Sequence, residues 1–350
     1  MKNIVLCFDH AQEQLQLRDA SNARALFRLL DATSGQLNWY HPGTVAAPAR
    51  IGERISPRQR RRHIAEQARA TVVEAYEFLA GTYEPGDDIY LFGAGRGASC
   101  ARELVRLLGV LGLPADHHDD LLDYLLAAFA LPRTRRTGED WQRVGALAAG
   151  LAGGSEIAVP VRFVGLFDMV RVPGVATTTG PLANVAEGRH AVAIDGGPFG
   201  ERVDSPTVDE VWFRGAHCDV AGVQGACWPL ADIALDWVLD GAVHAGLAVR
   251  DGGRNRVPAP CVADPLAGSA HMLSLRRVPL DAAVHASVEV YLRSHPQYWR
   301  RLPARFGWAD REWLARGERL VPPAAPATPA AATPAEATAS QPVDAELLTA

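Results

Sequence analysis

The feature that most constrains the fold is a strand that runs directly into a glycine-rich turn and then a helix. Residues 89–98 read IYLFGAGRGA: an apolar strand, glycines at alternate positions, and the start of a helix with apolar residues at helical spacing. Such a unit is typical of parallel α/β sheets, in which a buried strand turns sharply into the helix that covers it. We therefore expect an α/β protein.

Further apolar runs along the chain support a sheet that is covered by helices on both faces. Residues 3–8 read as a buried apolar strand, residues 158–167 as a further buried strand that is apolar apart from Arg162, and residues 210–213 as another short strand. Residues 63–79, 230–244 and 281–292 carry apolar residues at helical spacing and are expected to be helices. The sequence predicts a doubly wound, mostly parallel sheet.

Composition narrows the class of protein. The net charge of −5 over 350 residues argues against nucleic acid as the main partner. The apolar runs are too short for a membrane-spanning helix, and the first residues are typical of a buried strand rather than a signal peptide, so we expect the chain to be cytoplasmic at synthesis. The five cysteines are widely spaced without a C-x-x-C pair, so we expect reduced thiols, no metal and no cofactor.

The chain divides into one large domain and a tail. Residues 1–316 are expected to form the α/β domain, with a helical insertion at about 115–157 that serves as a cap over the strand ends. Residues 317–350, rich in Pro, Ala and Thr, are expected to be disordered. The acidic and histidine residues at 117–120 are interpreted as a helix start rather than a metal site, and the arginines at 58 and 60–62 as a solvated helix start rather than an anion site.

The strand, turn and helix at 89–98 are also the context of the nucleophile elbow of α/β-hydrolases, whose pattern is G-x-S-x-G. Gly95 stands where that pattern has its serine. Asp168 and His217 each follow a buried strand later in the chain, which is the order of acid and base in that fold. In such a site the histidine takes the nucleophile's proton and the carboxylate fixes the histidine tautomer.

Seven ordered motifs resemble the catalytic domain of the type VI secretion phospholipase effectors, over about residues 2–295. They begin with KNIV and Asp9 at the first strand, YHPGT at 40–44, YEPGDDIYLFGAGRGA at 83–98 and AREL at 101–104. They continue with FVGLFDMV at 163–170, HAVAID at 190–195 and VWFRGAHCDV at 211–220. The resemblance implies Asp168 as the acid, His217 as the base and Gly95 at the nucleophile position.

The resemblance also implies an activity and partners. Members of this bacterial family hydrolyse membrane phospholipid esters and are delivered to competing cells. It therefore implies phospholipid or a membrane surface as substrate, a type VI route of secretion without a signal peptide, and a secretion-apparatus or immunity protein as partner.

The departures from the family pattern gather around the chemistry. Gly95 replaces the family's elbow serine, and Gly93, Arg96 and Gly97 surround it in the elbow. The family's D-G-T after the first strand becomes Asp9, His10 and Ala11 here, in the loop where an oxyanion donor is expected. Cys218 replaces a serine between His217 and Asp219. Without the attacking oxygen, we expect a lipid-ester hydrolase that is inactive or strongly impaired. The alternative is a pseudoenzyme that uses the retained pocket to bind a lipid or a protein.

Other ways to retain chemistry stay open at this point. A water held by His217 and Asp168 can attack directly, Ser99 lies one helical turn beyond the elbow, and Cys218 adjoins the base. A metal held by Asp9, His10, Asp168, His217 and Asp219 is a further alternative, since all of them lie at strand ends.

Overall fold

The computed structural model describes residues 1–10, 21–32, 35–43, 56–113, 120–152, 157–176, 182–250, 263–269 and 274–313. The described residues up to Arg311 belong to one compact unit. The residues expected to form a disordered tail and the histidines at 117–118 lie outside the described residues, so those expectations stay predictions.

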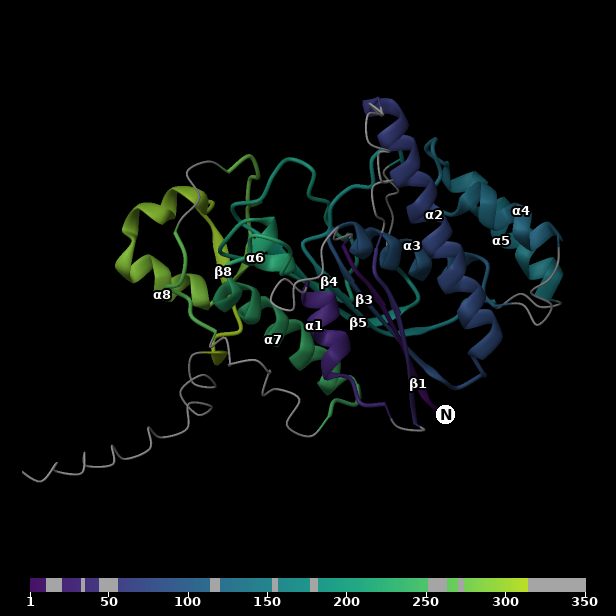
Figure 1. The fold of residues 1–350 in the computed structure, drawn as a ribbon, viewed down its shortest axis with the longest axis horizontal. Helices are drawn as coiled ribbons and strands as arrows, with labels where there is room; N and C mark the ends of the chain where they lie inside the picture. The colour runs from purple at the N-terminus through teal and green to yellow at the C-terminus, as the bar shows by residue number, and fades with distance from the viewer. Residues whose placement is uncertain are drawn as a thin grey trace, which may run out of the picture. The chain divides into compact units, whose positions relative to one another are not determined.

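The described part of this unit holds an eight-stranded sheet in which every neighbouring pair is parallel (Figure 1). Its strand order is β2-β1-β3-β4-β5-β6-β7-β8. The strands are β1 (Asn3–Phe8), β2 (Gln36–His41), β3 (Asp88–Ala94), β4 (Val161–Phe167), β5 (Val185–Ala193), β6 (Val208–Phe213), β7 (Ala282–His285) and β8 (Phe306–Ala309). The expectation of a doubly wound parallel sheet is confirmed.

Helices cover both faces of this sheet (Figure 1). They are α1 (Asn22–Leu29), α2 (Pro57–Thr82), α3 (Arg96–Val110), α4 (Asp120–Phe129), α5 (Gly138–Ala152), α6 (His217–Ala221), α7 (Trp228–His244), α8 (Ser287–Ser294) and the 3₁₀ helix η1 (Pro296–Arg301). Helices α2 and α3 pack on one face and α1 and α7 on the other, so the central strands are buried on both sides. This explains why β1, β3 and β4 consist mostly of apolar residues.

Helices α4 and α5 form within the residues expected to be an insertion, and α5 packs against α3. Apolar residues of both helices join the core beneath α3, and the buried Glu103 carboxylate of α3 accepts the backbone N–H of Leu131 after α4. A role of this insertion as a cap over the strand ends stays a prediction.

One predicted helix differs from the structure. Residues 281–292 were expected to be one helix, but residues 282–285 form strand β7, and helix α8 begins only at Ser287. Ala282 and Val284 are buried against the edge of the sheet because β7 pairs with both β6 and β8. Tertiary pairing therefore overrides the local helical pattern here. No helix in the described residues is long and apolar enough to cross a membrane.

Candidate active site

The turn after β3 has the backbone of a nucleophile elbow. Gly95 lies at φ 55° and ψ −114°, and α3 begins at the next residue. Its N–H donates to the carbonyl of Phe167 at 2.9 Å, and its own carbonyl accepts the N–H of Val170 at 3.1 Å. The elbow is thus fixed to the end of β4, which also delivers Asp168. This backbone conformation costs about 1–3 kcal/mol for a residue with a side chain but little for glycine.

The expected acid and base lie in contact. The Nδ1 atom of His217, the first residue of α6, is 2.8 Å from Oδ2 of Asp168. The Asp168 carboxylate is fully buried and its Oδ1 also accepts the N–H of Ala193 at 2.8 Å. The other ring nitrogen of His217, Nε2, is buried without a hydrogen-bond partner among the described residues. A histidine held this way presents Nε2 as a proton acceptor.

A residue that the sequence did not indicate completes this cluster. The Arg276 guanidinium donates to both carboxylate oxygens of Asp168, with Nη2 3.4 Å from Oδ2. The Arg276 side chain passes next to Gly196 on its way to Asp168. A Cβ added to Gly196 would lie 2.5 Å from the guanidinium carbon. Burial acts to raise the pKa of Asp168, but the hydrogen bonds and charges of His217 and Arg276 outweigh it and hold that pKa below its usual range.

His10 fills the space at the elbow. A Cβ added to Gly95 would lie 2.3 Å from Nδ1 of His10, a distance that real side chains do not reach. The same Nδ1 is 3.4 Å from the backbone N–H of Arg96, a long hydrogen bond. That N–H belongs to the residue after the nucleophile position, which supplies one oxyanion donor in α/β-hydrolases. His10 therefore occupies both the place of a nucleophile side chain and the front of one oxyanion donor.

The protonation of His10 agrees with this position. Burial, followed by the charges of Arg96 and His217, lowers the pKa of His10 to about 3. The ring is therefore neutral near pH 7 and its Nδ1 lone pair can accept from the Arg96 N–H. The rings of His10 and His217 lie side by side, with centroids 5.4 Å apart.

Asp9 does not point at the elbow as an oxyanion group. Its Oδ2 accepts the Tyr40 hydroxyl, its Oδ1 accepts the N–H of His10, and burial raises its pKa. Asp9 thus fixes the backbone of His10.

Gly93 and Gly97 lie where the start of α3 approaches the strands most closely: a Cβ on Gly97 would be 2.2 Å from the carbonyl oxygen of Phe8.

The alternative nucleophiles face elsewhere. The Ser99 hydroxyl is buried and donates to the carbonyl of Val170 at 2.8 Å. Burial raises the pKa of the Cys218 thiol to about 11, so it is protonated near pH 7, and its Sγ faces Asp219 at 3.8 Å. Asp219 accepts backbone N–H groups of Ala216 and Cys227, which makes it a cap for α6 and α7.

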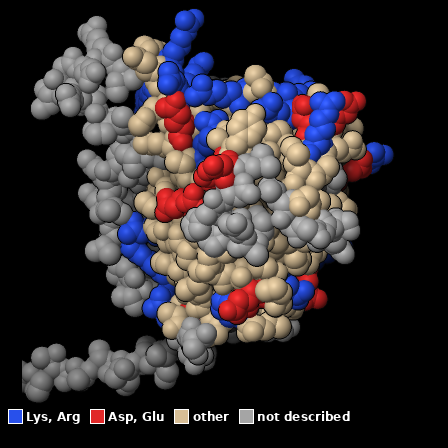
Figure 2. Space-filling view, turned by 90° about the vertical axis from the view of Figure 1, so that its right-hand side faces the viewer, with Lys and Arg blue, Asp and Glu red and all other residues tan. Residues whose placement is uncertain are grey.

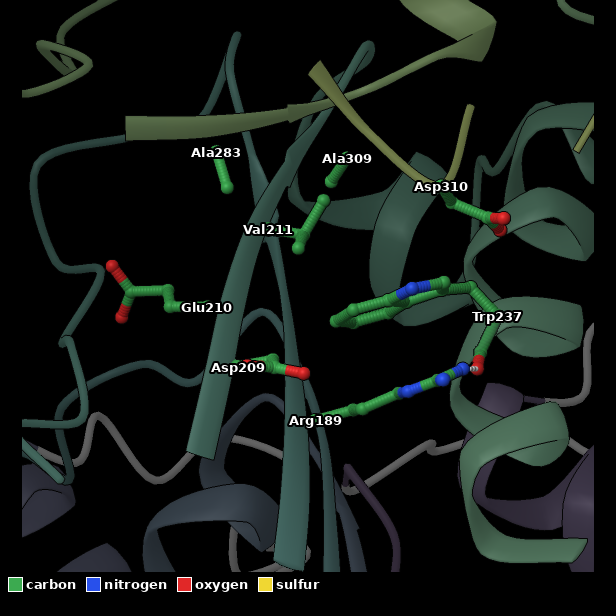
Figure 3. A pocket seen from close by; sticks show the side chains of 8 residues that line it. All are labelled: Arg189, Asp209, Glu210, Val211, Trp237, Ala283, Ala309 and Asp310. Atoms are coloured by element: carbon green, nitrogen blue, oxygen red, sulfur yellow. Dashed lines mark hydrogen bonds between the residues drawn. The ribbon is translucent and has the colours of Figure 1, made fainter. Parts of the chain in front are cut away.

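Two further findings concern ligands. Within the described ranges, no group of three or more His, Cys, Asp and Glu side chains is arranged to hold a metal ion. A cavity of about 320 Å³ lies at a different part of the sheet, beside α7 (Figure 3). Trp237 and Val211 line it together with the carboxylate-bearing Asp209 and Asp310, and none of the candidate site residues borders it.

The parallel sheet, the elbow turn and the ordered acid and base define an α/β-hydrolase-like protein. Comparison of the sequence with known families agrees: residues 2–241 match the family described as "T6SS, Phospholipase effector Tle1-like, catalytic domain". The chain belongs to this family.

Individual relatives are more distant. Over 211 residues the chain is 26% identical to the uncharacterized protein YEL023C of Saccharomyces cerevisiae, covering 55% of this chain but 31% of that protein. Among solved structures, the Tle1 effector bound to the VgrG spike of the type 6 secretion system is 15% identical at a TM-score of 0.35. That match covers 63% of this chain and 50% of the effector.

A second solved structure, ClbQ from the colibactin NRPS/PKS pathway, is 12% identical at a TM-score of 0.29. It covers 70% of this chain and 98% of ClbQ. The chain thus spans about a third to a half of the yeast relative and the effector, and the fold assignment rests on the sheet order and the family match.

Proposed function

We propose that this chain is a pseudoenzyme of the phospholipase effector family, in which the ester-hydrolysing step is blocked. The observation that carries this proposal is the position of His10, whose Nδ1 stands 2.3 Å from where a side chain at position 95 would begin. The loss of the nucleophile oxygen is accompanied by a ring that fills its space, so the two departures from the family pattern fit each other.

The missing oxygen and the position of His10 remove two requirements of ester hydrolysis. Covalent catalysis needs an oxygen at the elbow, a base to take its proton, and N–H donors for the oxyanion. Here the oxygen is absent and one donor, the N–H of Arg96, faces His10. In serine hydrolases that lose a triad member, only about 10³–10⁴-fold of rate enhancement over water remains.

A second candidate function is slow hydrolysis through a water molecule activated by His217. The unpartnered Nε2 of His217 and the 2.8 Å hydrogen bond to Asp168 favour it. The ion pair between Asp168 and Arg276 opposes it, because the guanidinium shares the negative charge that would stabilise a protonated His217.

Substrate class, delivery and partners follow from family membership. We propose membrane phospholipid as the molecule that the chain recognises, and a type VI secretion apparatus as the route of delivery. The solved Tle1 effector is bound to a VgrG spike, and a pull-down of this chain with such a spike protein tests the delivery part separately.

Turnover assays test the proposal. Wild-type protein is expected to hydrolyse neither phospholipid vesicles nor short acyl esters above the rate of buffer. Turnover that is lost in His217→Ala would overturn the pseudoenzyme and establish the water mechanism. Turnover that survives in His217→Ala marks a contaminating esterase, which a second purification step removes before the comparison is repeated.

A further inference from the structure

A cluster of exposed arginines lies at the start of α2. Ser56 and Gln59 form a capping box there and Pro57 takes the first helical position, so the helix begins with a well-fixed turn. The arginines at 58 and 60–62 follow at once and all are exposed. Four cations at the N-terminus of a helix oppose its dipole, which favours negative charge. Helix stability therefore does not explain them.

A second element extends this cluster. The connection between α4 and α5 brings Arg133 beside α2, where Arg62 and Arg133 both pair with Glu66, at 2.7 and 3.1 Å. Arg135 on the same connection is exposed. We call Arg58, Arg60, Arg61, Arg62, Arg133 and Arg135 the arginine rim. Acidic residues also lie here: Glu66 is shared by two arginines, and Glu139 and Asp140 at the start of α5 pair with Arg143 and Thr137.

Figure 2 draws the side of the molecule that lies on the right in Figure 1. Lys and Arg side chains gather along its upper edge, over the first turns of α2 and the α4–α5 connection. The whole chain carries a net charge of −5, so this gathering runs against the average charge of the protein. A local excess of one sign focuses the electrostatic potential outward and attracts a partner of opposite charge.

The arginine rim lies at the same edge of the sheet as the candidate site. The C-terminus of α2 leads into the first residue of β3. The N-terminal turns of α2 therefore lie at the other end of the strands, the end where the parallel strands finish. The backbone of Arg61 approaches Gly174 on the loop that follows Asp168. The mostly buried guanidinium of Arg96 at the elbow has its pKa lowered by burial and, more weakly, by the charge of Arg60.

This edge also exposes a large apolar side chain. Phe199, on the loop after β5, is 70% exposed. Its carbonyl accepts the N–H of Arg171, which follows β4, so the loop is fixed to the strand ends. Phe199 and the arginine rim thus both contact the segment that follows β4, at Arg171 and Gly174 respectively. Exposed cations and an exposed aromatic ring at the same end of a fold are the combination that peripheral proteins use at a bilayer, where cations meet headgroups and the ring enters the interface.

We propose that the strand-end edge, with the arginine rim and Phe199, is a docking surface for the headgroups of an anionic phospholipid bilayer. Docking there would bring the membrane to the elbow loops, whatever the state of the nucleophile position. A nucleic acid offers the same negative charge, but Phe199 favours the bilayer because it gains an apolar layer there.

Vesicle flotation tests the proposal with intact protein. Phosphatidylcholine vesicles with and without phosphatidylglycerol are mixed with wild type, with Arg58→Gln/Arg60→Gln/Arg61→Gln, and with Phe199→Ala. The matched control is Arg293→Gln/Arg300→Gln/Arg311→Gln, which changes the net charge equally at exposed positions on other elements. Thermal unfolding by circular dichroism verifies that each variant is folded.

Wild type is expected to bind only the vesicles with phosphatidylglycerol, and high salt should weaken that binding. Each cation near an anionic surface strengthens binding by roughly fivefold, so the rim variant should bind about a hundredfold more weakly. Phe199→Ala should weaken binding by several-fold and the control variant should match wild type. Three results would overturn the proposal: no binding to either vesicle, equal loss in the rim and control variants, or tighter rim-dependent binding to duplex DNA than to the vesicles. Failure here leaves the turnover assays unaffected.

Discussion

Gly95→Ser should damage the protein rather than restore it. The new Cβ would lie 2.3 Å from Nδ1 of His10 and 3.1 Å from Cε1 of His217, so the His10 ring must move. A side chain at φ 55° costs about 1–3 kcal/mol, and overpacking a well-packed site costs about 1–3 kcal/mol more. Together these effects predict a loss of about 2–6 kcal/mol in the free energy of unfolding.

His10→Gly should remove most of that penalty. It opens the space at the elbow, and it also returns position 10 to the glycine of the family's D-G-T pattern. In the double variant His10→Gly/Gly95→Ser only the backbone strain remains, so the serine should cost about 1–3 kcal/mol instead. The two substitutions should therefore couple favourably by about 1–3 kcal/mol.

A double-mutant cycle measures this coupling. Urea unfolding of wild type, both single variants and the double variant, followed by circular dichroism, gives the four free energies of unfolding. Effects that add within about 0.5 kcal/mol would mean that the His10 ring does not occupy the space of a side chain at position 95.

Three further predictions concern buried groups around the site. Arg276→Met removes the charge partner of the fully buried Asp168 and should cost about 3–5 kcal/mol near neutral pH. The pKa of Asp168 in the folded protein lies below the unfolded value of about 3.9, so its ionised carboxylate stabilises the folded protein above about pH 3.9. That stabilisation is lost as the pH falls through the folded pKa. In the variant, acid unfolding followed by circular dichroism should therefore begin at a higher pH than in wild type. Gly196→Ala places a Cβ 2.5 Å from the Arg276 guanidinium and should lower the free energy of urea unfolding by about 1–3 kcal/mol. The control Gly197→Ala, whose Cβ has nothing within 4 Å, should be neutral or slightly stabilising. Equal effects of the two variants would mean that the Arg276 side chain does not pass next to Gly196. Burial raises the pKa of Glu103 above its unfolded value, so its ionisation destabilises the folded protein as the pH rises. Glu103→Gln should therefore raise the urea midpoint more at about pH 7 than at about pH 4. An equal rise at both pH values would exclude a buried ionised group as the cause.

Much of the scaffold could be predicted from sequence because its signals are local. The strands β1, β3 and β4 are apolar runs buried on both faces, and the glycines after β3 mark a sharp turn into α3. Asp168 and His217 follow β4 and β6, two strands of one parallel sheet, so both residues lie at the end of the sheet where the strands finish. The hydrogen bond between them is the consequence of that topology.

The remainder depends on long-range contacts that leave no local pattern. Arg276 belongs to an irregular segment and reaches Asp168 across 108 residues of chain. His10 was placed in the oxyanion loop, but only the structure shows that its ring points into the elbow. The local pattern predicts a helix where the short strand β7 lies, because its pairing with β6 and β8, rather than its own residues, decides its conformation.

The elbow lacks a nucleophile, and the His10 ring fills the place of one. Fluorophosphonate labelling, read by intact mass, tests this most directly on wild type, Gly95→Ser, His10→Gly/Gly95→Ser and the same double variant with His217→Ala. We expect no adduct on wild type, little on Gly95→Ser, and one adduct at position 95 on the double variant that is lost with His217→Ala. Full labelling of Gly95→Ser alone would show instead that His10 does not block the elbow, since the serine would then have room and activation with His10 in place.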